Sequence, residues 1–428
     1  MPQFPAQRAR QLTTFALITG LGLVLTGCHK SPQPLAEPAQ GKDYNKPLPP
    51  GALALRKITD PNEIPDFSHA FGMRAGLDEA IAHSLNYMSK PSSKQFYPYG
   101  EISHDQVVAS LQEFRRMLNE AGSGDDLNRL IRERFDVYTS VGYDNNGIVY
   151  FTGYYTPIFD ARLQPDATYK YPLYKMPPDL VKDSAGNTIG RRGSDGSVTP
   201  GYHDRRQLVS SEILKGQELC YLKDPFEAYI VTVQGSAKLR LADGSFFEIG
   251  YDANNGHEYV SIGQKLVEDG KIPADQLSLK GLIDYFRAYP NEIQFYTNQN
   301  PRYVFFTPRA GGPFGCLNER VTPYRTIATD KQIYPRAAVA FMQTQLPASE
   351  GGSIRQKTYH GFALDQDAGG AIRAAGRCDV FLGVGDAAGD LAGRTASEGR
   401  LYYLFTKSPA NVAQATADEH RRGELNSE

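Results

Sequence analysis

The feature that most constrains the fold is a change of sequence pattern near Tyr143. Before it, residues 76–138 place apolar side chains at helical spacing, with Ser103 as a helix N-cap and a second short helix from Asp125. After it, short β-like runs alternate with glycine, aspartate and proline. A helical segment followed by many short strands predicts a mainly β protein of the α+β class.

The individual elements expected after this change are short. Strands are expected at 148–151, 229–233, 238–241, 246–249 and 303–306, and helices at 261–269 and 277–287. Two dipeptides have the composition of hairpin turns, namely Asn146-Gly147 and Asp243-Gly244. The polar, glycine-rich segment 180–202 predicts a surface insertion.

The first residues have the order of an export signal. Arg8 and Arg10 precede an uncharged apolar run at 12–25, which is shorter than the about 20 residues that span a bilayer. The run ends in Leu-Thr-Gly-Cys28, which is similar to a lipobox, in which the cysteine becomes the lipidated N-terminus. An ordinary signal peptide with a chance cysteine, or an uncleaved anchor, are the alternatives. Because His29 follows Cys28 in place of aspartate, resemblance to enterobacterial lipoproteins predicts anchoring in the outer membrane, facing the periplasm.

Two further segments are predicted to lie outside the folded body. The Pro-rich residues 28–52 predict a tether that would reach about 70 Å at about 3 Å per residue. Residues 408–428 predict a polar tail. Removal of a signal peptide at 1–27 leaves about 400 residues, which suits two domains better than one.

The composition argues against several classes of function. A net charge of −2 argues against a nucleic-acid partner, which would favour a strongly basic face. The chain has no CxxC or HExxH metal pattern, no phosphate-binding glycine loop and no GxSxG elbow. If Cys28 carries lipid, Cys220, Cys316 and Cys378 remain, and either one disulfide with a free thiol or no disulfide is open. Tyrosine and phenylalanine must provide any stacking on sugar rings, because there is no tryptophan.

Two carboxylates near the end of the chain are candidate catalytic groups. Asp367 lies in QDAGGAIR and Asp379 lies in RCDVFLG. Apolar neighbours disfavour the charged form of a carboxyl, so the pKa of such an aspartate rises and it can act as a general acid. A turn position or a solvent-facing strand position is the alternative for each. Adjacent strand residues point to opposite faces, so the Cys378 thiol is expected to face away from Asp379.

Other segments carry groups that suit sugars. FTGYYTP at 151–157 offers phenols and hydroxyls, and VQGS at 233–236 and NGHEY at 255–259 offer amides and hydroxyls. A strand with packed tyrosines, or turns and caps, are the alternatives.

Together these segments resemble the membrane-bound lytic murein transglycosylase A family. The resemblance covers about 143–406 and includes YPLYKMPPDL at 171–180, NGHEYVSIG at 255–263, NPRYVFF at 300–306, RTIATD at 325–330 and CDVFLGVGDAAGDLAGR at 378–394. It implies a double-psi β-barrel domain with an inserted, β-rich second domain and a groove between them. The barrel domain would comprise 53–160 and 300–407, and the insert 161–299.

The resemblance also implies an activity and a set of site residues. Family members cleave the β-1,4 bond between N-acetylmuramic acid and N-acetylglucosamine, leave a 1,6-anhydro end and use one catalytic aspartate, which matches Asp379. Asp367 matches a second aspartate near the glycan. Two segments match groove-lining positions: Thr152, Gly153, Tyr154, Tyr155 and Thr156, and Gln234, Gly235 and Ser236.

The implied partners are peptidoglycan glycan strands, the membrane through lipidated Cys28, and complexes of cell-wall synthesis or hydrolysis. No metal or organic cofactor is implied. A hydrolytic glycosidase that divides acid and base duties between Asp367 and Asp379, and a lipoprotein that only binds the wall, are the rival functions.

Overall fold

The structure is a computed structural model that describes residues 42–183, 186–273, 277–370 and 372–407. The export signal with Cys28, most of the predicted tether and the predicted tail at 408–428 lie outside the described residues. Within the described ranges, every helix is too short or too polar to cross a membrane.

The N-terminal part is helical, as predicted. The Ser103 hydroxyl caps α2 by accepting a hydrogen bond from the Gln106 main-chain N–H. The second predicted helix, α3, is capped by Ser123 and begins one residue before Asp125. The helices of this part are α1 (Leu77–Ser89), α2 (His104–Glu120) and α3 (Gly124–Arg134), with the short 3-10 turns η1 (Pro61–Glu63), η2 (Ser68–Gly72) and η3 (Pro91–Phe96).

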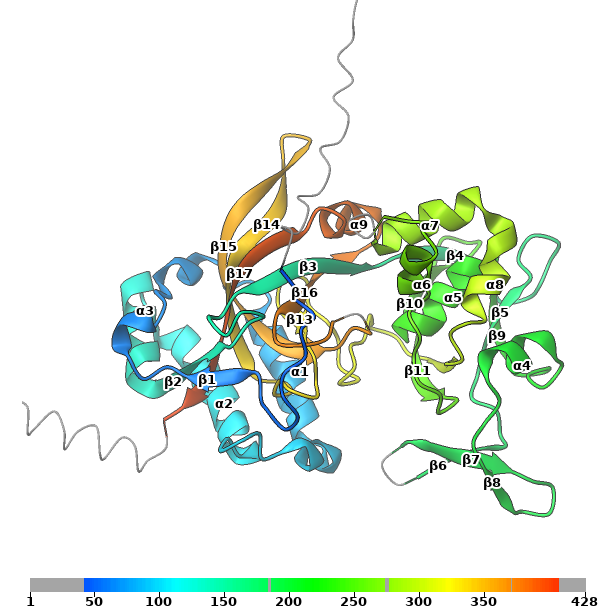
Figure 1. Ribbon diagram of the computed structural model, residues 1–428, viewed down its shortest axis with the longest axis horizontal. Coiled ribbons are helices and arrows are strands. Elements are labelled where there is room, and N and C mark those ends of the chain that lie inside the picture. The colour runs from blue at the N-terminus through cyan, green and yellow to red at the C-terminus, as the bar shows by residue number, and fades with distance from the viewer. Residues whose placement is uncertain (1–41, 184–185, 274–276, 371, 408–428) are drawn as a thin grey trace, which may run out of the picture. The chain divides into compact units, whose positions relative to one another are not determined.

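A closed six-stranded β-barrel forms the main body (Figure 1). The strands pair in the order β17-β14-β15-β13-β16-β3, and β3 pairs back onto β17 to close the barrel. Strands β1 and β2 extend the sheet from β17. The strands are β1 (Leu55–Lys57), β2 (Phe135–Ser140), β3 (Val149–Thr156), β13 (Thr326–Ala328), β14 (Val339–Glu350), β15 (Ser353–Asp367), β16 (Arg377–Val384) and β17 (Ala396–Thr406).

The chain between β3 and β13 forms a second sheet with its own hydrophobic core. This sheet has the order β12-β11-β10-β4-β9-β5. The α+β class and the presence of an inserted β-rich unit are therefore confirmed, while the exact domain boundaries stay a prediction. The strands are β4 (Ile158–Arg162), β5 (Tyr171–Tyr174), β9 (Glu218–Leu222), β10 (Ala237–Arg240), β11 (Phe246–Asn254) and β12 (Val304–Pro308).

Helices accompany both sheets. The predicted helices at 261–269 and 277–287 are α6 and α7, and each begins after a serine cap, Ser261 and Ser278. The helices are α4 (Arg205–Ser210), α5 (Pro225–Gln234), α6 (Ile262–Glu268), α7 (Leu279–Ala288), α8 (Ile293–Thr297) and α9 (Asp386–Ala392), with a 3-10 turn η5 (Pro290–Glu292).

The strand predicted at 229–233 is wrong, because these residues lie in α5. The Asp224 carboxylate accepts hydrogen bonds from the main-chain N–H groups of Phe226 and Glu227, and Pro225 occupies the first turn. Gly235 ends the helix with φ of +79°. A short run of buried β-branched and aromatic residues has no distinctive period, so a buried helix reads like a strand.

The two predicted hairpins have different outcomes. Asp243-Gly244 joins β10 to the antiparallel β11, as predicted. Asn146-Gly147 lies in a turn, but the flanking strands β2 and β3 both pair with β17 and not with each other, so the hairpin is wrong.

The segment 180–202 is a surface element, as predicted, and it has order of its own. It forms a three-stranded sheet that is exposed at most positions (Figure 1). The strands are β6 (Leu180–Lys182), β7 (Thr188–Arg192) and β8 (Val198–Pro200).

The described end of the predicted tether, residues 42–52, contacts the barrel. Tyr44 is 7% exposed, stacks on Tyr150 and donates a hydrogen bond of 2.6 Å to Glu398. Lys42 pairs with the same carboxylate at 2.7 Å. Lys42 and Tyr44 therefore hold the start of this stretch against the body, which the proline-rich composition does not predict.

The cap of α5 gives a stability test. Replacement of Asp224 by alanine removes two hydrogen bonds to the first turn, and we expect the free energy of unfolding to fall by roughly 1–2 kcal/mol. Urea unfolding followed by circular dichroism measures this change. Asp224→Asn retains a capping oxygen and should lose only a small part of it, so equal losses in both variants would contradict the capping role.

Candidate active site

The parallel pairing of β3 with β16 sets one face of the site. Asp379 lies opposite Thr152 in the register, and Phe381 lies opposite Tyr154. These four residues alternate with Phe151, Cys378 and Val380, which belong to the buried barrel core. The Cys378 thiol therefore faces away from Asp379, as strand alternation predicts.

A β-bulge in β15 places Asp367 near that face. Regular alternation would put Asp367 on the same side as Asp365, which is fully buried. The register shifts between Ile327, which pairs with Asp365, and Ala328, which pairs with Asp367, so that β15 holds one extra residue. Bulges re-aim side chains in this way near functional sites. Asp367 consequently meets the phenol of Tyr154, which donates a hydrogen bond of 2.6 Å to Oδ2.

Ala328 links the two aspartates. It pairs with Asp367 on β15 and with Asp379 on β16, because β13 lies between those strands. Neighbouring strands are about 4.8 Å apart, so the two aspartate backbones are about 10 Å apart across β13. The charge of Asp367 is among the causes that raise the pKa of Asp379. The structure thus brings together the two carboxylates that the sequence identifies.

Asp367 is surrounded by hydrogen-bond donors. In addition to the Tyr154 phenol, the main-chain N–H groups of Cys316 and Ala368 each donate to Oδ1 at 2.8 Å. Burial raises the pKa of Asp367, and these three donors and the charge of Lys331 oppose that shift. Burial also raises the pKa of Tyr154 well above its usual value, so the phenol remains a donor.

Asp379 has fewer hydrogen-bond donors around its carboxyl group than Asp367. Its Oδ1 is buried and has no hydrogen-bond partner in the described part of the chain. Burial raises the pKa of Asp379 to about 6, although the charge of Arg377 and a hydrogen bond from Thr152 both act to lower it. A carboxyl with this pKa holds its proton at mildly acidic pH and gives it up at neutral pH, as a general acid–base group must.

Arg377 is a site residue that the sequence did not single out. Its guanidinium donates a hydrogen bond of 3.3 Å to the Thr152 hydroxyl and lies 5.6 Å from the Tyr150 ring. Burial lowers the pKa of Arg377, and the Asp379 charge opposes this shift. Its position two residues before Asp379 on the same strand, and so on the same face, is the signal that could have found it.

The residues predicted at 152–156 have different environments. Thr152 and Tyr154 lie beside the aspartates, whereas Tyr155 and Thr156 are buried at 8% and 6% exposure. Gly153 faces packed side chains, since an added Cβ would lie 2.9 Å from Leu382 and from the Thr395 Cβ. Gly153 therefore serves close packing.

The side chains of Gln234 and Ser236 form hydrogen bonds with main-chain atoms close to the site. The Gln234 amide donates a hydrogen bond of 3.3 Å to the Tyr155 carbonyl. The Ser236 hydroxyl, in a residue 4% exposed, accepts from the Phe314 N–H at 3.3 Å. Gly235 lies between them as the helix cap. Phe314 belongs to the loop that brings the Cys316 N–H to Asp367, so this segment supports the loop.

The cysteine alternatives are resolved for the described residues: Cys220, Cys316 and Cys378 are all free thiols. Within the same ranges no group of three or more His, Cys, Asp or Glu side chains is arranged to hold a metal ion.

Comparison with known proteins agrees with this arrangement. Residues 150–307 match the model of the MltA specific insert domain, and residues 325–405 match that of the 3D domain. The membrane-bound lytic murein transglycosylase A of Escherichia coli K12 is 28% identical over 82% of this chain and 88% of its own length. The Vibrio cholerae protein of the same name is 26% identical over 93% of this chain and 97% of its own.

Solved structures share the fold. A membrane-bound lytic murein transglycosylase from Agrobacterium tumefaciens has a TM-score of 0.67 at 22% identity, covering 82% of this chain and 98% of that chain. Escherichia coli MltA with bound chitohexaose has a TM-score of 0.60 at 23% identity, covering 88% of this chain and 100% of that chain. With both family domains matched in order along the barrel and the insert, the chain belongs to the membrane-bound lytic murein transglycosylase A family and is an enzyme of that family.

Proposed function

We propose that this chain cleaves the β-1,4 bond between N-acetylmuramic acid and N-acetylglucosamine in peptidoglycan and leaves a 1,6-anhydro-N-acetylmuramic acid end. The names of its relatives support cleavage of murein. The observation that carries the mechanism is the buried carboxyl of Asp379, whose Oδ1 has no partner among the described residues and whose pKa is raised by burial to about 6.

The first step uses Asp379 as an acid. The protonated carboxyl gives its proton to the glycosidic oxygen as the bond from that oxygen to C1 of the muramic acid breaks. Positive charge then develops at C1 and the ring oxygen. General acid catalysis of this kind contributes about 10²–10⁴-fold to the rate.

The second step uses the same residue as a base. The Asp379 carboxylate takes the proton of the C6 hydroxyl of the same sugar, and that oxygen bonds to C1. The proton lost in the first step is thereby regained, and no water enters the product. An intramolecular nucleophile has a high effective concentration, so a second carboxylate is not required to activate it.

Asp367 has a supporting role in this proposal. Burial raises its pKa, and three hydrogen-bond donors oppose that shift, whereas the Asp379 Oδ1 has no donor among the described residues. A carboxylate held in this way would orient a sugar hydroxyl or stabilise the developing positive charge. Arg377 and Thr152 would set the charge state of Asp379.

The glycan would bind along the face that carries these groups. We propose that Thr152 and Tyr154 contact the sugar directly, and that Gly153, Tyr155 and Thr156 hold the strand that presents them. Gln234, Gly235 and Ser236 would line the other side of a groove. No metal or organic cofactor takes part in this proposal.

The proposed location is the cell envelope. Lipidated Cys28 would anchor the chain in the outer membrane, where it would face the periplasm and could join complexes of wall synthesis or hydrolysis. Relatives named as membrane-bound support this location. An anchor of this kind would limit cutting to the wall beside the membrane.

The reaction products provide the first test. Wild-type digests of purified peptidoglycan should contain anhydro-muropeptides. Each is about 18 Da lighter than the corresponding hydrolytic product, because hydrolysis adds one water molecule per bond cut and transglycosylation adds none. Mass spectrometry separates the two outcomes. Products with reducing ends alone would establish the hydrolytic rival.

Substitution of the proposed acid should also remove the activity. Asp379→Asn keeps the shape of the side chain but cannot donate and regain the proton, so we expect the rate to fall by about 10²–10⁴-fold. Asp105→Asn is the matched control, because the Asp105 side chain is 98% exposed. Glycan binding by the Asp379 variant separates loss of chemistry from loss of binding. A variant that cut strands at the wild-type rate would disprove the assignment.

The pH dependence gives a third test. The free enzyme needs protonated Asp379, so kcat/KM should fall as pH rises through about 6. The Thr152 hydrogen bond stabilises the ionised carboxyl and lowers its pKa, so Thr152→Val should move the falling limb to higher pH by roughly one unit or less. Thr152→Ser retains a hydroxyl and should leave the limb in place. A shift to lower pH in the valine variant would contradict the proposed electrostatics.

A further inference from the structure

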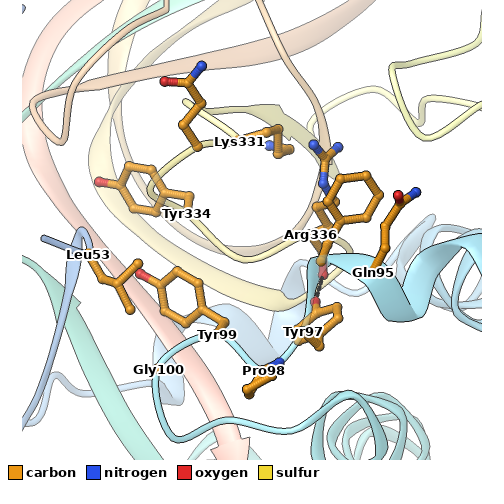
Figure 2. Close-up of a pocket in the computed structure, with 11 residues that line it drawn as sticks. Leu53, Gln95, Tyr97, Pro98, Tyr99, Gly100, Lys331, Tyr334 and Arg336 are labelled. Carbon is orange, nitrogen blue, oxygen red and sulfur yellow. Dashed lines mark hydrogen bonds between the residues drawn. The ribbon is translucent and has the colours of Figure 1, made fainter. Parts of the chain in front are cut away.

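A polar cavity lies apart from the aspartate pair and takes no part in the mechanism above. It has a volume of about 280 Å³ and lies between the turn that follows η3 and the segment 331–336 that follows β13 (Figure 2). Figure 2 shows its side chains around one hollow, with the Tyr97 hydroxyl bonded to the Arg336 main chain. The lining residues are Leu53, Gln95, Phe96, Tyr97, Pro98, Tyr99, Gly100, Lys331, Gln332, Tyr334 and Arg336.

The residues that line the cavity carry an excess of positive charge. The lining includes Lys331 and Arg336 but no aspartate or glutamate. Lys331 is neutralised, because its ammonium pairs with the fully buried Asp365 and donates to the Thr329 hydroxyl at 2.9 Å. Arg336 differs: its guanidinium lies 3.8 Å from the Phe96 ring, and its buried Nε has no partner in the described part of the chain.

Tyr87 provides a second donor of the same kind. It is 6% exposed, and its hydroxyl also has no hydrogen-bond partner within the described residues. Burial raises the pKa of Tyr87 to about 12, and the Arg336 charge opposes this shift, so the two groups lie within electrostatic reach of each other. A buried donor without a partner costs about 1–3 kcal/mol. At the cavity itself, the Arg336 Nε is the buried donor that lacks an acceptor among the described residues.

The chemistry of the cavity favours a carboxylate on a small apolar body. A planar guanidinium binds a carboxylate through two parallel hydrogen bonds. The rings of Phe96, Tyr97 and Tyr99 offer faces for an apolar or peptide group beside it. At about 30 Å³ per water molecule, the volume equals roughly nine waters, which suits one or two amino-acid residues.

The cavity is close enough to the candidate active site for charges at the two sites to interact. Lys331 follows Ala328, the residue that pairs with both aspartates, by three positions. The Lys331 charge acts on Asp367, and burial raises the pKa of Cys316 to about 12 against the charges of both Lys331 and Arg336. A ligand in the cavity would therefore lie within reach of a strand bound at Asp367 and Asp379.

We propose that this cavity binds a free carboxylate of a peptidoglycan stem peptide, with Arg336 as its main partner. The inference rests on the proposed function, because it names the part of the substrate that occupies this site. N-acetylglucosamine has no ionisable group, and the carboxyl of N-acetylmuramic acid is consumed in the amide bond to the stem peptide. The carboxylates of an uncut strand consequently belong to its peptides.

Direct binding is the primary test, with the full chain as the protein. Calorimetry compares a synthetic stem peptide with the same peptide after amidation of its carboxyl groups. Wild type should bind the free peptide at least about tenfold more tightly than the amide. Arg336→Gln should lose that preference, and Arg336→Lys should keep part of it because the charge remains. Arg355→Gln, an exposed position on the β14–β15 hairpin, is the matched control and should behave as wild type.

Three outcomes would overturn the inference. They are equal binding of the free and amidated peptides by wild type, an unchanged preference in Arg336→Gln, and acetate that displaces the peptide at equal concentration. The last would show a site for any small carboxylate. Peptide binding does not depend on cleavage, so failure here with normal anhydro products removes only this inference. Binding without cleavage would remove only the proposed function.

Kinetics provide the second readout. The ratio of kcat/KM on strands with free stem-peptide carboxyls to kcat/KM on strands with the same carboxyls amidated should fall about tenfold in Arg336→Gln, mainly through KM. A purely structural role would lower both values together and leave the ratio unchanged, and that result would contradict the proposal. Thermal unfolding of each variant checks that the fold is retained.

Discussion

The position of β13 between β15 and β16 is the constraint on which the candidate site depends. Ala328 pairs with Asp367 on one side and with Asp379 on the other, so two residues that lie twelve apart in sequence meet at one end of the barrel. Closure of the barrel through β3 and β17 holds these strands in register, and the parallel pairing of β3 with β16 adds Thr152 and Tyr154 to the same face. The bulge before Asp367 completes the arrangement, because without it Asp367 would share the buried side of Asp365. The positions of the site residues are thus determined by strand order and register.

Two carboxyl groups in one site acquire different properties from their surroundings. Asp367 receives three hydrogen bonds, which favour its charged form. Asp379 has a buried oxygen without a partner among the described residues, and burial outweighs the help of Arg377 and Thr152. An isolated pair of aspartates would divide the roles only through such differences in solvation and hydrogen bonding. Lys331 and Arg336 differ in the same way, because Lys331 is neutralised by Asp365, whereas the Arg336 Nε has no partner among the described residues.

The sequence was most informative where a local pattern determines the outcome. A serine cap located α2, apolar spacing indicated α6 and α7, and composition indicated the turn at Asp243-Gly244. It failed where tertiary context decides. The buried run in α5 has no period that distinguishes helix from strand, and Asn146-Gly147 turns the chain between strands that pair elsewhere. Both aspartates were found, whereas Arg377, the Cys316 N–H and the bulge were missed because their roles come from register and loop contacts that no local pattern encodes.

The most direct test of the central claim is the titration of the Asp379 carboxyl itself. In the full chain labelled with ¹³C at aspartate carboxyl carbons, the Asp379 signal is identified by its loss in Asp379→Asn. We expect this signal to titrate with a midpoint of about 6. An Asp379 signal that titrates near the ordinary value of 3.8 would contradict the assignment of Asp379 as the acid.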